Sequence, residues 1–497
     1  MTDTIVVGLD GAGFELLGPL VEEGELPALA EIFERGVIGD LESVLPPVTS
    51  PNWKAYLTGK NPAKLGIFWW HNVDVENRRV HRPVERYQDH TEYWEVLAEA
   101  GERVGVLGVP TTYPPKPAGE FVVSGPPDAE ESGYTHPPSL EAELKERFDY
   151  RVNKRGLIDL DDPPSCEEVL DIIDTRFEAA THLFDERSLS FMQVTTFYIN
   201  ALHHNLWDHE YTIRGWKIID DHLASLLERD CNLVLMSDHG HAEIETVFNI
   251  NAWLEREGYL TYDRELSDRL HSMGVNTDRI KRLLVRIDRT LPGMEVRSAV
   301  ERAAPRWLIN RLPDESGELG GSKHEMADWD ETDAIASAQG PVYITVDRES
   351  ARYELVREAL VDALSTLTGP DGRPIATAVH RAEEVYEGPY LAEAPDIVID
   401  KAPHVNIREG FGAAEVFPET DPSWRGVNTR SGLFAAVGPD FRAGTVEGMS
   451  ILDLAPTLLH LHGQPVPDDM DGRVRRSVFA EDSPPANESV RELEADD

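Results

Sequence analysis

The sequence predicts an α/β fold with a mostly parallel central sheet, helices on both faces of that sheet, and an inserted helical cap. Short apolar, β-branched runs recur along the 497-residue chain, and helical patterns separate them. Parallel strands need long crossover connections, which helices supply, so this alternation favours a parallel sheet. One stretch, from about residue 260 to residue 330, has helical patterns without strands, and this predicts the cap.

The first strand is the run IVVGL at residues 5–9, and a Gly turn separates it from an amphipathic helix at residues 26–33. Five further runs share its apolar character and lie at residues 104–108, 192–197, 233–236, 397–399 and 433–437. The other helices are expected at residues 93–100, 140–148, 167–183, 216–227 and 452–461. Ligands of such folds gather at the carboxyl ends of the strands, so polar residues there are the first candidates for a site.

The cap divides the core into two parts, residues 1–259 and residues 331–480. Within the cap, residues 260–330, the best helical patterns lie at 279–291 and 305–312, and the stretch 315–324 is typical of a loop. The tail, residues 481–497, is acidic and contains Pro, so we expect it to be disordered.

The composition is strongly acidic but still allows a large core. Asp and Glu number 91 against 47 Lys and Arg, which gives a formal charge of −44, while 41% of the residues are hydrophobic. This charge argues against nucleic-acid binding, which needs clustered cations, and against an anionic membrane surface. A carboxylate-rich surface is suited to a salt-rich cytoplasm, where screening shortens self-repulsion; the alternative is an ordinary acidic protein.

Three further features lead us to expect a cytoplasmic protein. Two cysteines, Cys166 and Cys231, do not make a disulfide framework. The N-terminal residues run directly into the first strand and lack the basic and apolar regions of a signal peptide. No window approaches 18 consecutive apolar residues, so no membrane insertion is expected.

Charged side chains follow two of the expected strands. Asp10 ends the first strand in VVGLDGAG, where it can face a ligand or cap the next helix. Asp238 and His239 follow the strand NLVLM in the segment SDHGH. Adjacent Asp and His on a loop can converge on one ion, and together they are suited to zinc or manganese. The alternative for this pair is a polar turn.

The segment PPVTSPNWKAYLTGKNP, residues 46–62, predicts a loop followed by a short helix. Pro51 is suited to the first helical position with Ser50 as the N-cap, so Thr49 is expected just before the helix. The helix N-terminus favours an anion, which makes the Thr49 hydroxyl a candidate nucleophile or metal ligand. Asn52, one turn on, is placed to donate to a phosphoryl oxygen, and an ordinary capped helix is the alternative.

The segment FYINALHHNLWDHE, residues 197–210, is rich in histidine. Asn200 and His204 are four residues apart, so they share a face if the segment is helical. His203 and His209 lie close by. A single histidine is more often structural, but this group is a weak signal for a metal or a base.

Together these segments resemble the alkaline phosphatase superfamily, and in particular its type I phosphodiesterase/nucleotide pyrophosphatase and predicted phosphohydrolase/phosphomutase branch. With the acidic composition, the resemblance is to a haloarchaeal-type member. It extends over about residues 10–473 and rests on GLDGAG, PPVTSPNW…TGKNPAKLGIF, GVPTTYPP, SDHGHAEIETVFNINAWLEREGYL, EGPYLAEAPDIVI and ILDLAPTLLHLHG…DMDGRV. It implies an alkaline-phosphatase-like core.

The resemblance also implies a metal centre with a Thr nucleophile. In the family one ion is bound by Asp, the nucleophile and an Asp-His pair, and the matching residues are Asp10, Thr49, Asp238 and His239. The Asn three residues after the nucleophile binds the phosphoryl group, and Asn52 matches it.

The second metal site of the family departs from the pattern in this chain. It normally has Asp-x-x-x-His and a later His in a Gly-x-His segment, and the matching residues are Asn200, His204 and Asn428. Only His204 has the expected type, and an Asn carbonyl is a weak ligand for a dication. We therefore expect one firmly bound divalent ion at the first site, with zinc favoured over manganese or magnesium.

The function that follows is hydrolysis or transfer of a small-molecule phosphate ester, with phosphodiesters favoured, through a phospho-threonine at Thr49. His204, or His203, is the candidate for proton transfer, and Lys54 or Arg430 is the candidate for an additional positive charge. The sequence does not indicate the substrate or the oligomeric state.

Three other functions were weighed. A sulfatase needs Cys or Ser at the nucleophile and an Arg where Trp53 stands. A cofactor-independent phosphoglycerate mutase needs both metal sites. The alternative from another class is a non-catalytic metal- or phosphate-binding relative, which Asn200 and Asn428 favour and the intact first site disfavours.

Overall fold

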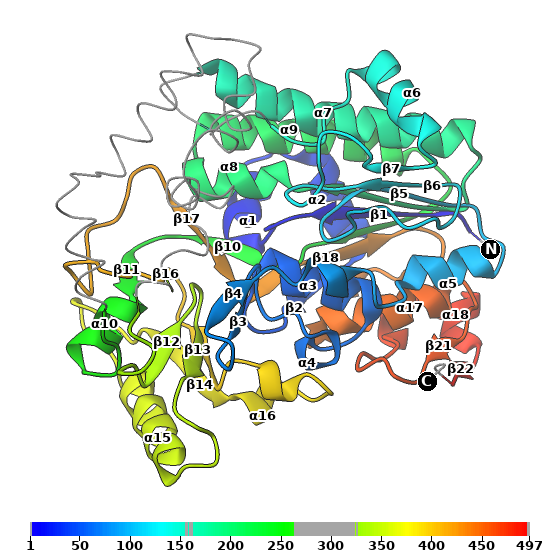
Figure 1. Ribbon diagram of the computed structural model, residues 1–497. Coiled ribbons are helices and arrows are strands. Elements are labelled where there is room, and N and C mark those ends of the chain that lie inside the picture. Colours follow the sequence, from blue (N-terminus) through cyan, green and yellow to red (C-terminus); the bar gives the residue numbers. More distant parts are fainter. Residues whose placement is uncertain (1, 155–157, 159–162, 263–323, 325–326, 495–497) are drawn as a thin grey trace.

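The predicted α/β architecture is confirmed in a computed structural model, which describes residues 2–154, 158, 163–262, 324 and 327–494 (Figure 1). Within that part of the chain, a 10-stranded sheet forms the centre of the molecule. Its strands, in order across the sheet, are β19 (Gly444–Thr445), β2 (Val37–Glu42), β18 (Ser431–Val437), β9 (Asn232–Met236), β1 (Thr4–Leu9), β8 (Phe191–Thr196), β5 (Val104–Val109), β6 (Phe121–Ser124) and β7 (Thr135–His136), with β20 (Met449–Ser450) beside β2.

The middle of this sheet is parallel. Strand β1 pairs in parallel with β8 on one side and β9 on the other, so that Leu9 lies beside Thr196 and Gly8 beside Met236. Strands β5 and β8 are also parallel, whereas β18 runs antiparallel to both β9 and β2. The carboxyl ends of β1, β8 and β9 therefore meet at one edge of the sheet.

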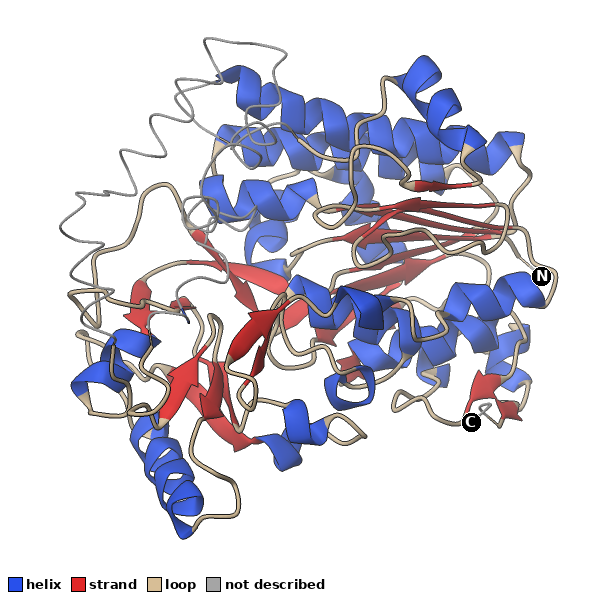
Figure 2. Cartoon of the chain, in the orientation of Figure 1, coloured by secondary structure: helices blue, strands red, loops and turns tan. Residues whose placement is uncertain are grey.

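Helices cover both faces of the sheet (Figures 1 and 2). One face is covered by α1 (Phe14–Glu22), α2 (Pro27–Arg35), α6 (Ser139–Phe148), α7 (Pro163–Glu186), α8 (Tyr198–Leu206) and α9 (Glu210–Leu227). The opposite face packs against α3 (Thr49–Thr58), α5 (Tyr93–Glu99) and α17 (Leu454–Leu461). Alternate residues of β1 enter the two cores, with Val7 on the first face and Val6 on the second, as a strand buried on both faces requires.

A second, smaller sheet lies beside the first, at the lower left of Figure 1. Its antiparallel strands are β12 (Ala334–Ala336), β13 (Pro341–Ile344), β15 (Ile397–Lys401) and β14 (Ala376–Arg381). Helices α10 (Ile250–Arg256) and α15 (Ala351–Ser365) share its apolar core. The expected strand at 397–399 is confirmed as part of β15, but it belongs to this sheet and not to the central one.

Short strand pairs and helical turns complete the described fold. The pairs are β10 (Gly240–Glu243) with β17 (Gly426–Thr429), β11 (Thr246–Asn249) with β16 (Val405–Arg408), β3 (Asn72–Asp74) with β4 (Arg79–His81), and β21 (Val466–Pro467) with β22 (Glu492–Leu493). The turns are α4 (Pro62–Leu65), α16 (Ala382–Val385), α18 (Pro484–Asn487), η1 (Val84–Tyr87), η3 (Leu391–Glu393), η4 (Ile451–Asp453) and η5 (Arg476–Val478).

The expectations for the cap and for the C-terminal tail have different outcomes. The helical cap at 260–330 lies almost entirely outside the described residues and stays a prediction. The tail differs from the expected disorder as far as residue 494, because β22 pairs with β21 and the ring of His460 contacts the Pro485 carbonyl at 2.8 Å. The charged residues of the tail thus lie next to α18 and β22, and α18 packs on α17.

The cysteines and the lengths of the helices are also described by the structure. Cys166 and Cys231 are buried, and neither forms a disulfide. Every helix in the described ranges is too short or too polar to span a bilayer.

Candidate metal and phosphoryl site

The candidate site lies where three parallel strands of the central sheet end. Asp10 follows β1, the pair Asp238 and His239 follows β9, and helix α8 begins two residues after β8. Because β1 pairs with both neighbours in parallel, all three groups reach the same edge. The side chains of Asp10, Asp238 and His239 are fully buried there.

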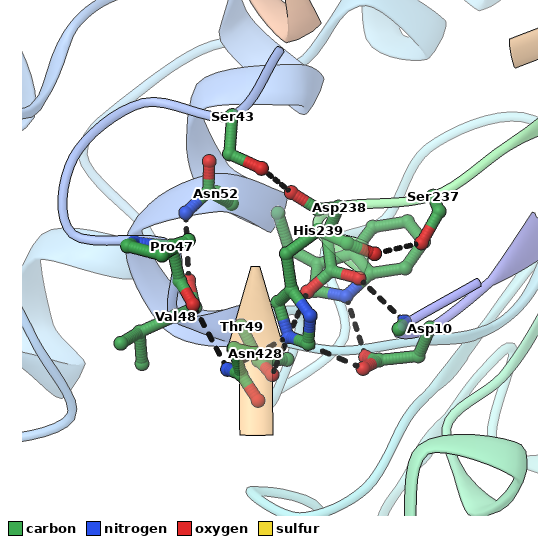
Figure 3. Close-up of polar contacts among 12 residues, drawn as sticks. Asp10, Ser43, Pro47, Val48, Thr49, Asn52, Ser237, Asp238, His239 and Asn428 are labelled. Atoms are coloured by element: carbon green, nitrogen blue, oxygen red, sulfur yellow. Dashed lines mark hydrogen bonds and ion pairs between the residues drawn. The ribbon is translucent and has the colours of Figure 1, made fainter. Parts of the chain in front are cut away.

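Helix α3 brings Thr49 to this edge (Figure 3). The helix begins at Thr49 with Val48 as its N-cap, which is earlier than the sequence predicts. The reason is that the backbone amide of Asn52 donates to the Val48 carbonyl at 3.2 Å, so the first helical turn begins at Thr49 and includes Pro51. Thr49 is thus a helical residue, 3% exposed, at the positive end of the helix dipole.

The ring nitrogen Nε2 of His239 lies at the centre of the cluster. It is 3.2 Å from Thr49 Oγ1, 3.2 Å from Asp238 Oδ2 and 3.8 Å from Asp10 Oδ1. The other ring nitrogen, Nδ1, lies 3.1 Å from the Gly240 carbonyl, which can only accept, so Nδ1 donates to it. Nε2 therefore presents a lone pair toward the carboxylate oxygens.

In each carboxylate, one oxygen accepts a hydrogen bond from the protein and the other oxygen faces the cluster. Asp10 Oδ2 accepts from the Trp53 indole at 2.8 Å, and Asp238 Oδ1 accepts from the Gly11 amide at 3.1 Å. Asp10 Oδ1 and Asp238 Oδ2 are buried and accept no hydrogen bond. One ligand atom from each of Asp10, Asp238 and His239 falls within 4.8 Å of the others, so these residues fit a divalent cation.

The electrostatics support a cation at this point. Burial, and then the charge of Asp238, raises the pKa of Asp10 well above its ordinary value. Burial also raises the pKa of Asp238 to about 8, and it lowers the pKa of His239 well below its ordinary value. A dication would restore the ionised carboxylates, and the neutral imidazole is the form that binds metals.

Asn52 lies beside Thr49, but its side-chain amide faces the preceding loop. The Nδ2 group donates to the carbonyls of Pro46 at 2.9 Å and Val48 at 3.0 Å, and Oδ1 accepts from the Val44 amide at 2.8 Å. Asn52 thus holds the loop that carries Thr49. Its expected contact with a phosphoryl oxygen stays a prediction, since it would need one of these bonds to break.

The residues expected at the second metal site do not form a cluster of ligands. Asn428 Nδ2 donates to the Pro47 carbonyl at 2.9 Å and contacts His239 Nε2 at 3.1 Å, so Asn428 borders the first site. His204 Nδ1 donates to the Gly426 carbonyl at 2.9 Å, and its ring stacks on Trp424. Asn200 Oδ1 is buried and accepts no hydrogen bond.

Four other candidates have structural partners. His203 Nε2 accepts from the Trp216 indole at 2.9 Å, and His209 is the N-cap of α9. Lys54 is fully buried in an ion pair with Glu92 at 2.6 Å. Arg430 pairs with Asp400 and with Glu42 at 2.9 and 2.7 Å.

Two residues near the site escape sequence reasoning. His241 packs edge to face on His204, with ring centroids 4.4 Å apart, and its place in SDHGH is the signal that could have found it. Lys401 is buried at the end of β15 and contacts the side chain of Gln339. Gln339 follows Ala338, which packs on Val48 beside Thr49, so the small sheet brings the Lys401 side chain toward the cluster. Burial lowers the pKa of Lys401 well below its ordinary value.

Comparisons with known proteins agree with this fold. Phosphonoacetate hydrolase from Sinorhizobium meliloti 1021, in complex with phosphonoacetate, is similar in structure, with a TM-score of 0.58 and 16% identity over 91% of this chain and 94% of that chain. Human ectonucleotide pyrophosphatase/phosphodiesterase 5 gives a TM-score of 0.51 and 14% identity over 96% and 99% of the two chains.

A murine ectonucleotide pyrophosphatase/phosphodiesterase 5, an inactive Thr-to-Ala variant in complex with AMP, gives a TM-score of 0.51 and 13% identity over 97% and 100% of the chains. No curated protein matches the sequence. The family model described as type I phosphodiesterase/nucleotide pyrophosphatase matches residues 4–425. The chain therefore belongs to the type I phosphodiesterase/nucleotide pyrophosphatase family, within the alkaline phosphatase superfamily.

Proposed function

We propose that this protein is a metal-dependent phosphoric ester hydrolase that favours small-molecule phosphodiesters and works through a covalent phospho-threonine at Thr49. The observation that carries the proposal is the contact of Thr49 Oγ1 with His239 Nε2 at 3.2 Å, inside the buried cluster that fits a cation. Family membership supports phosphoester cleavage, and the inactive murine relative lacks a threonine hydroxyl.

Asp10, Thr49, Asp238 and His239 would hold the cation. Carboxylate and imidazole ligands together favour zinc, with manganese and magnesium as alternatives. When bound, such an ion supplies Lewis-acid chemistry, because it lowers the pKa of a ligating hydroxyl and polarises a phosphoryl oxygen.

The chain's own residues carry the two displacement steps. Thr49 Oγ1 gives up its proton and forms a bond to phosphorus while the bond from phosphorus to the leaving oxygen breaks, and that oxygen takes up a proton. Water then attacks the phospho-threonine, so that Thr49 regains its proton and the phosphate product leaves. His204 is the candidate to accept the proton of that water, since its Nδ1 donates to Gly426 and its Nε2 keeps a lone pair.

Positive groups are needed to hold the phosphoryl oxygens during these steps. The N-terminus of α3 points its dipole at the nucleophile. Burial lowers the pKa of Lys401 well below its ordinary value, and a phosphoryl anion bound beside this amine would favour its charged form. Lys401 replaces Lys54 and Arg430 as the candidate for this charge, because those two residues are engaged in ion pairs elsewhere.

The second candidate function is a metal- or phosphate-binding protein without turnover. The observation that favours it is the pair of neutral amides, Asn200 and Asn428, at positions where the family carries Asp and His. Binding alone does not require Thr49, so the hydroxyl distinguishes the two functions.

Thr49→Ala is the direct test. It should lower turnover of an aryl phosphodiester by at least about a thousandfold and abolish a phosphoryl adduct on this residue, which mass spectrometry detects after acid quenching. Thr58→Ala is the matched control, since Thr58 is also buried in α3 but its hydroxyl bonds only backbone groups away from the cluster, donating to the Lys54 carbonyl at 2.7 Å and accepting from the Lys60 amide at 3.3 Å. Undiminished turnover by Thr49→Ala would overturn the scheme, and a wild type that binds metal without turning over mono- or diesters would favour the binding protein.

A further inference from the structure

The ring of His241 lies among the three residues expected at the second metal site, Asn200, His204 and Asn428. We propose that this imidazole takes the place of a second ion, so that the chain holds a single cation at Asp10, Asp238 and His239. The inference rests on the proposed function, because it concerns the same centre, and three contacts support it.

The first contact is with His204. His241 Nε2 lies 3.3 Å from His204 Nδ1 and 3.4 Å from its Nε2, and the two rings are inclined by 75°. Nearly equal distances to both nitrogens mean that the edge of His241 faces the flat side of the His204 ring. The lone pairs of the two residues therefore do not point at a common centre, which argues against an ion shared between them.

The second contact is with Gly11, whose turn also lies close to Asn200. A Cβ atom built on Gly11 would lie 2.5 Å from His241 Nδ1 and 3.0 Å from Asn200 Oδ1, so both side chains close on the same spot. Gly11 has φ of +72°, a conformation that suits glycine, and its carbonyl accepts from His241 Nδ1 at 3.1 Å. The glycine thus makes room for the imidazole and holds it.

The third contact is with the strand that carries Asn428. His241 in β10 and Asn428 in β17 are direct partners in the antiparallel pair, so their side chains lie on the same face. The neighbouring Gly426 also leaves space for the ring, since a Cβ atom there would lie 3.2 Å from His241 Cδ2. The ring is therefore enclosed by Asn200, His204 and β17.

The donor set agrees with a site that holds no second ion. Asn200 and Asn428 offer neutral amide oxygens, which are weaker ligands for a dication than carboxylate or imidazole. A second ion would need His241 to leave its hydrogen bond with Gly11 and the closely packed rings around it. The residues of this chain do not fit the second metal of the family, and no step is derived through it.

A consequence concerns the class of substrate. Two-metal centres stabilise both the attacking and the leaving oxygen of a displacement. With a single cation near Thr49, the leaving oxygen lacks that help, so esters whose leaving group is a weak base should be favoured. Aryl phosphodiesters and phosphoric anhydrides belong to this class, whereas simple alkyl diesters do not.

The test measures bound metal, independently of activity. After exposure to Zn²⁺ and dialysis, mass spectrometry should find one ion per wild-type chain. Asn200→Asp/His241→Ala/Asn428→His restores the carboxylate and imidazole ligands and removes the ring of His241, so it should bind two ions. Asn200→Asp/Asn428→His, which keeps His241, is the matched control and should remain at one.

Two results would overturn the inference. One is a wild type with two ions, above all if His241→Ala reduces it to one, since His241 would then be a ligand. The other is a folded triple variant that gains no ion over the matched control. Asp10→Asn should remove the first ion in every background. A wild type without any ion would contradict the proposed metal dependence, and the comparison of triple variant with control would still decide the role of His241.

Discussion

Trp53 orients the Asp10 carboxylate through its indole, and this contact predicts an effect on metal affinity. In Trp53→Phe, Asp10 Oδ2 loses the 2.8 Å hydrogen bond from Nε1 and is free to turn away from the cluster. Loss of such an orienting partner typically weakens metal binding by about 10–100-fold. We therefore expect the Zn²⁺ dissociation constant of Trp53→Phe, measured by calorimetry, to rise within this range.

Trp94→Phe is the control for that variant. Trp94 is fully buried in the same core, but its Nε1 has no hydrogen-bond partner in the structure. The two variants lose similar packing, so only the loss of the hydrogen bond distinguishes them. Equal metal affinity in the two variants would show that the indole does not orient Asp10.

The pKa of Asp238 predicts how metal binding responds to pH. In the metal-free chain its pKa is raised to about 8, whereas an unfolded Asp has a pKa of about 3.9. Between these values the folded chain keeps a proton that the unfolded chain has lost, so the metal-free fold loses stability as pH rises through this window. A dication removes this penalty by pairing with the carboxylate.

The stabilisation by Zn²⁺ should therefore grow from pH 5 to pH 8. Its measure is the difference between the melting temperature with Zn²⁺ and the melting temperature with a chelator. The low pKa of His239, which burial causes, keeps its ring neutral throughout most of this range and does not oppose the trend. A difference that is constant or shrinks toward pH 8 would contradict the assignment of Asp238 as a ligand.

The sequence reveals a site residue when a local pattern determines its position, and misses it when tertiary packing does. Asp10, Asp238 and His239 follow apolar strands directly, and the strand pattern predicts where strands end. Trp53 reaches Asp10 across 43 positions and His241 reaches Gly11 across 230, so these contacts depend on tertiary packing that no local pattern encodes. Lys401 belongs to a sheet whose position relative to the site is likewise a tertiary property.

At the scale of elements, a buried ion pair joins α3 to α5. Lys54 Nζ lies 2.6 Å from Glu92 Oε1 and donates to the Tyr87 carbonyl at 2.8 Å, with the side chains 0% and 4% exposed. Lys54→Met would leave Glu92 buried without its partner, and breaking a buried pair costs about 3–5 kcal/mol. We expect urea denaturation to show a loss of stability of this order.

Glu92→Gln in the Lys54→Met background removes the unpaired buried charge and should recover part of the lost stability. The zinc affinity of the folded single variant should stay near the wild-type value, because Lys54 does not contact the metal cluster. A Lys54→Met variant that keeps its stability but loses substrate binding would instead show that Lys54 acts in substrate binding.

Elements with a long apolar signal are predicted well, and short polar ones are not. The strands β1, β5, β8, β9 and β18 and the helices α2, α5, α6, α7 and α17 match the sequence patterns within a few residues, whereas α1 is not expected from the sequence and α9 begins earlier than expected. The pair β10 and β17, of four residues each, carries polar side chains and has no alternation that distinguishes it from loop. This pair brings His241 opposite Asn428, so the part of the site that it builds is hidden from sequence reasoning.

At the scale of the whole molecule, the charge of −44 opposes the approach of an anionic substrate. In the proposed function the candidate site would reverse this locally, because the proposed cation and the N-terminus of α3 would provide positive potential within a small buried region. The surface carboxylates repel an anionic substrate while it approaches through solvent, and salt screens this repulsion. The short contacts inside the buried site are screened much less.

Raising KCl from about 0.1 M toward 1 M shortens the screening length from about 10 Å to about 3 Å. We therefore expect KM for an aryl phosphodiester to fall over this range while kcat changes little, since encounter is screened and the reaction is not. A monoester carries more negative charge, so its KM should fall more steeply if it is turned over. The same screening should raise the melting temperature by relieving self-repulsion among surface carboxylates. Activity and melting temperature that are both highest in dilute buffer would show that the acidic surface is not adapted to salt, and that the positive site alone governs how the substrate arrives.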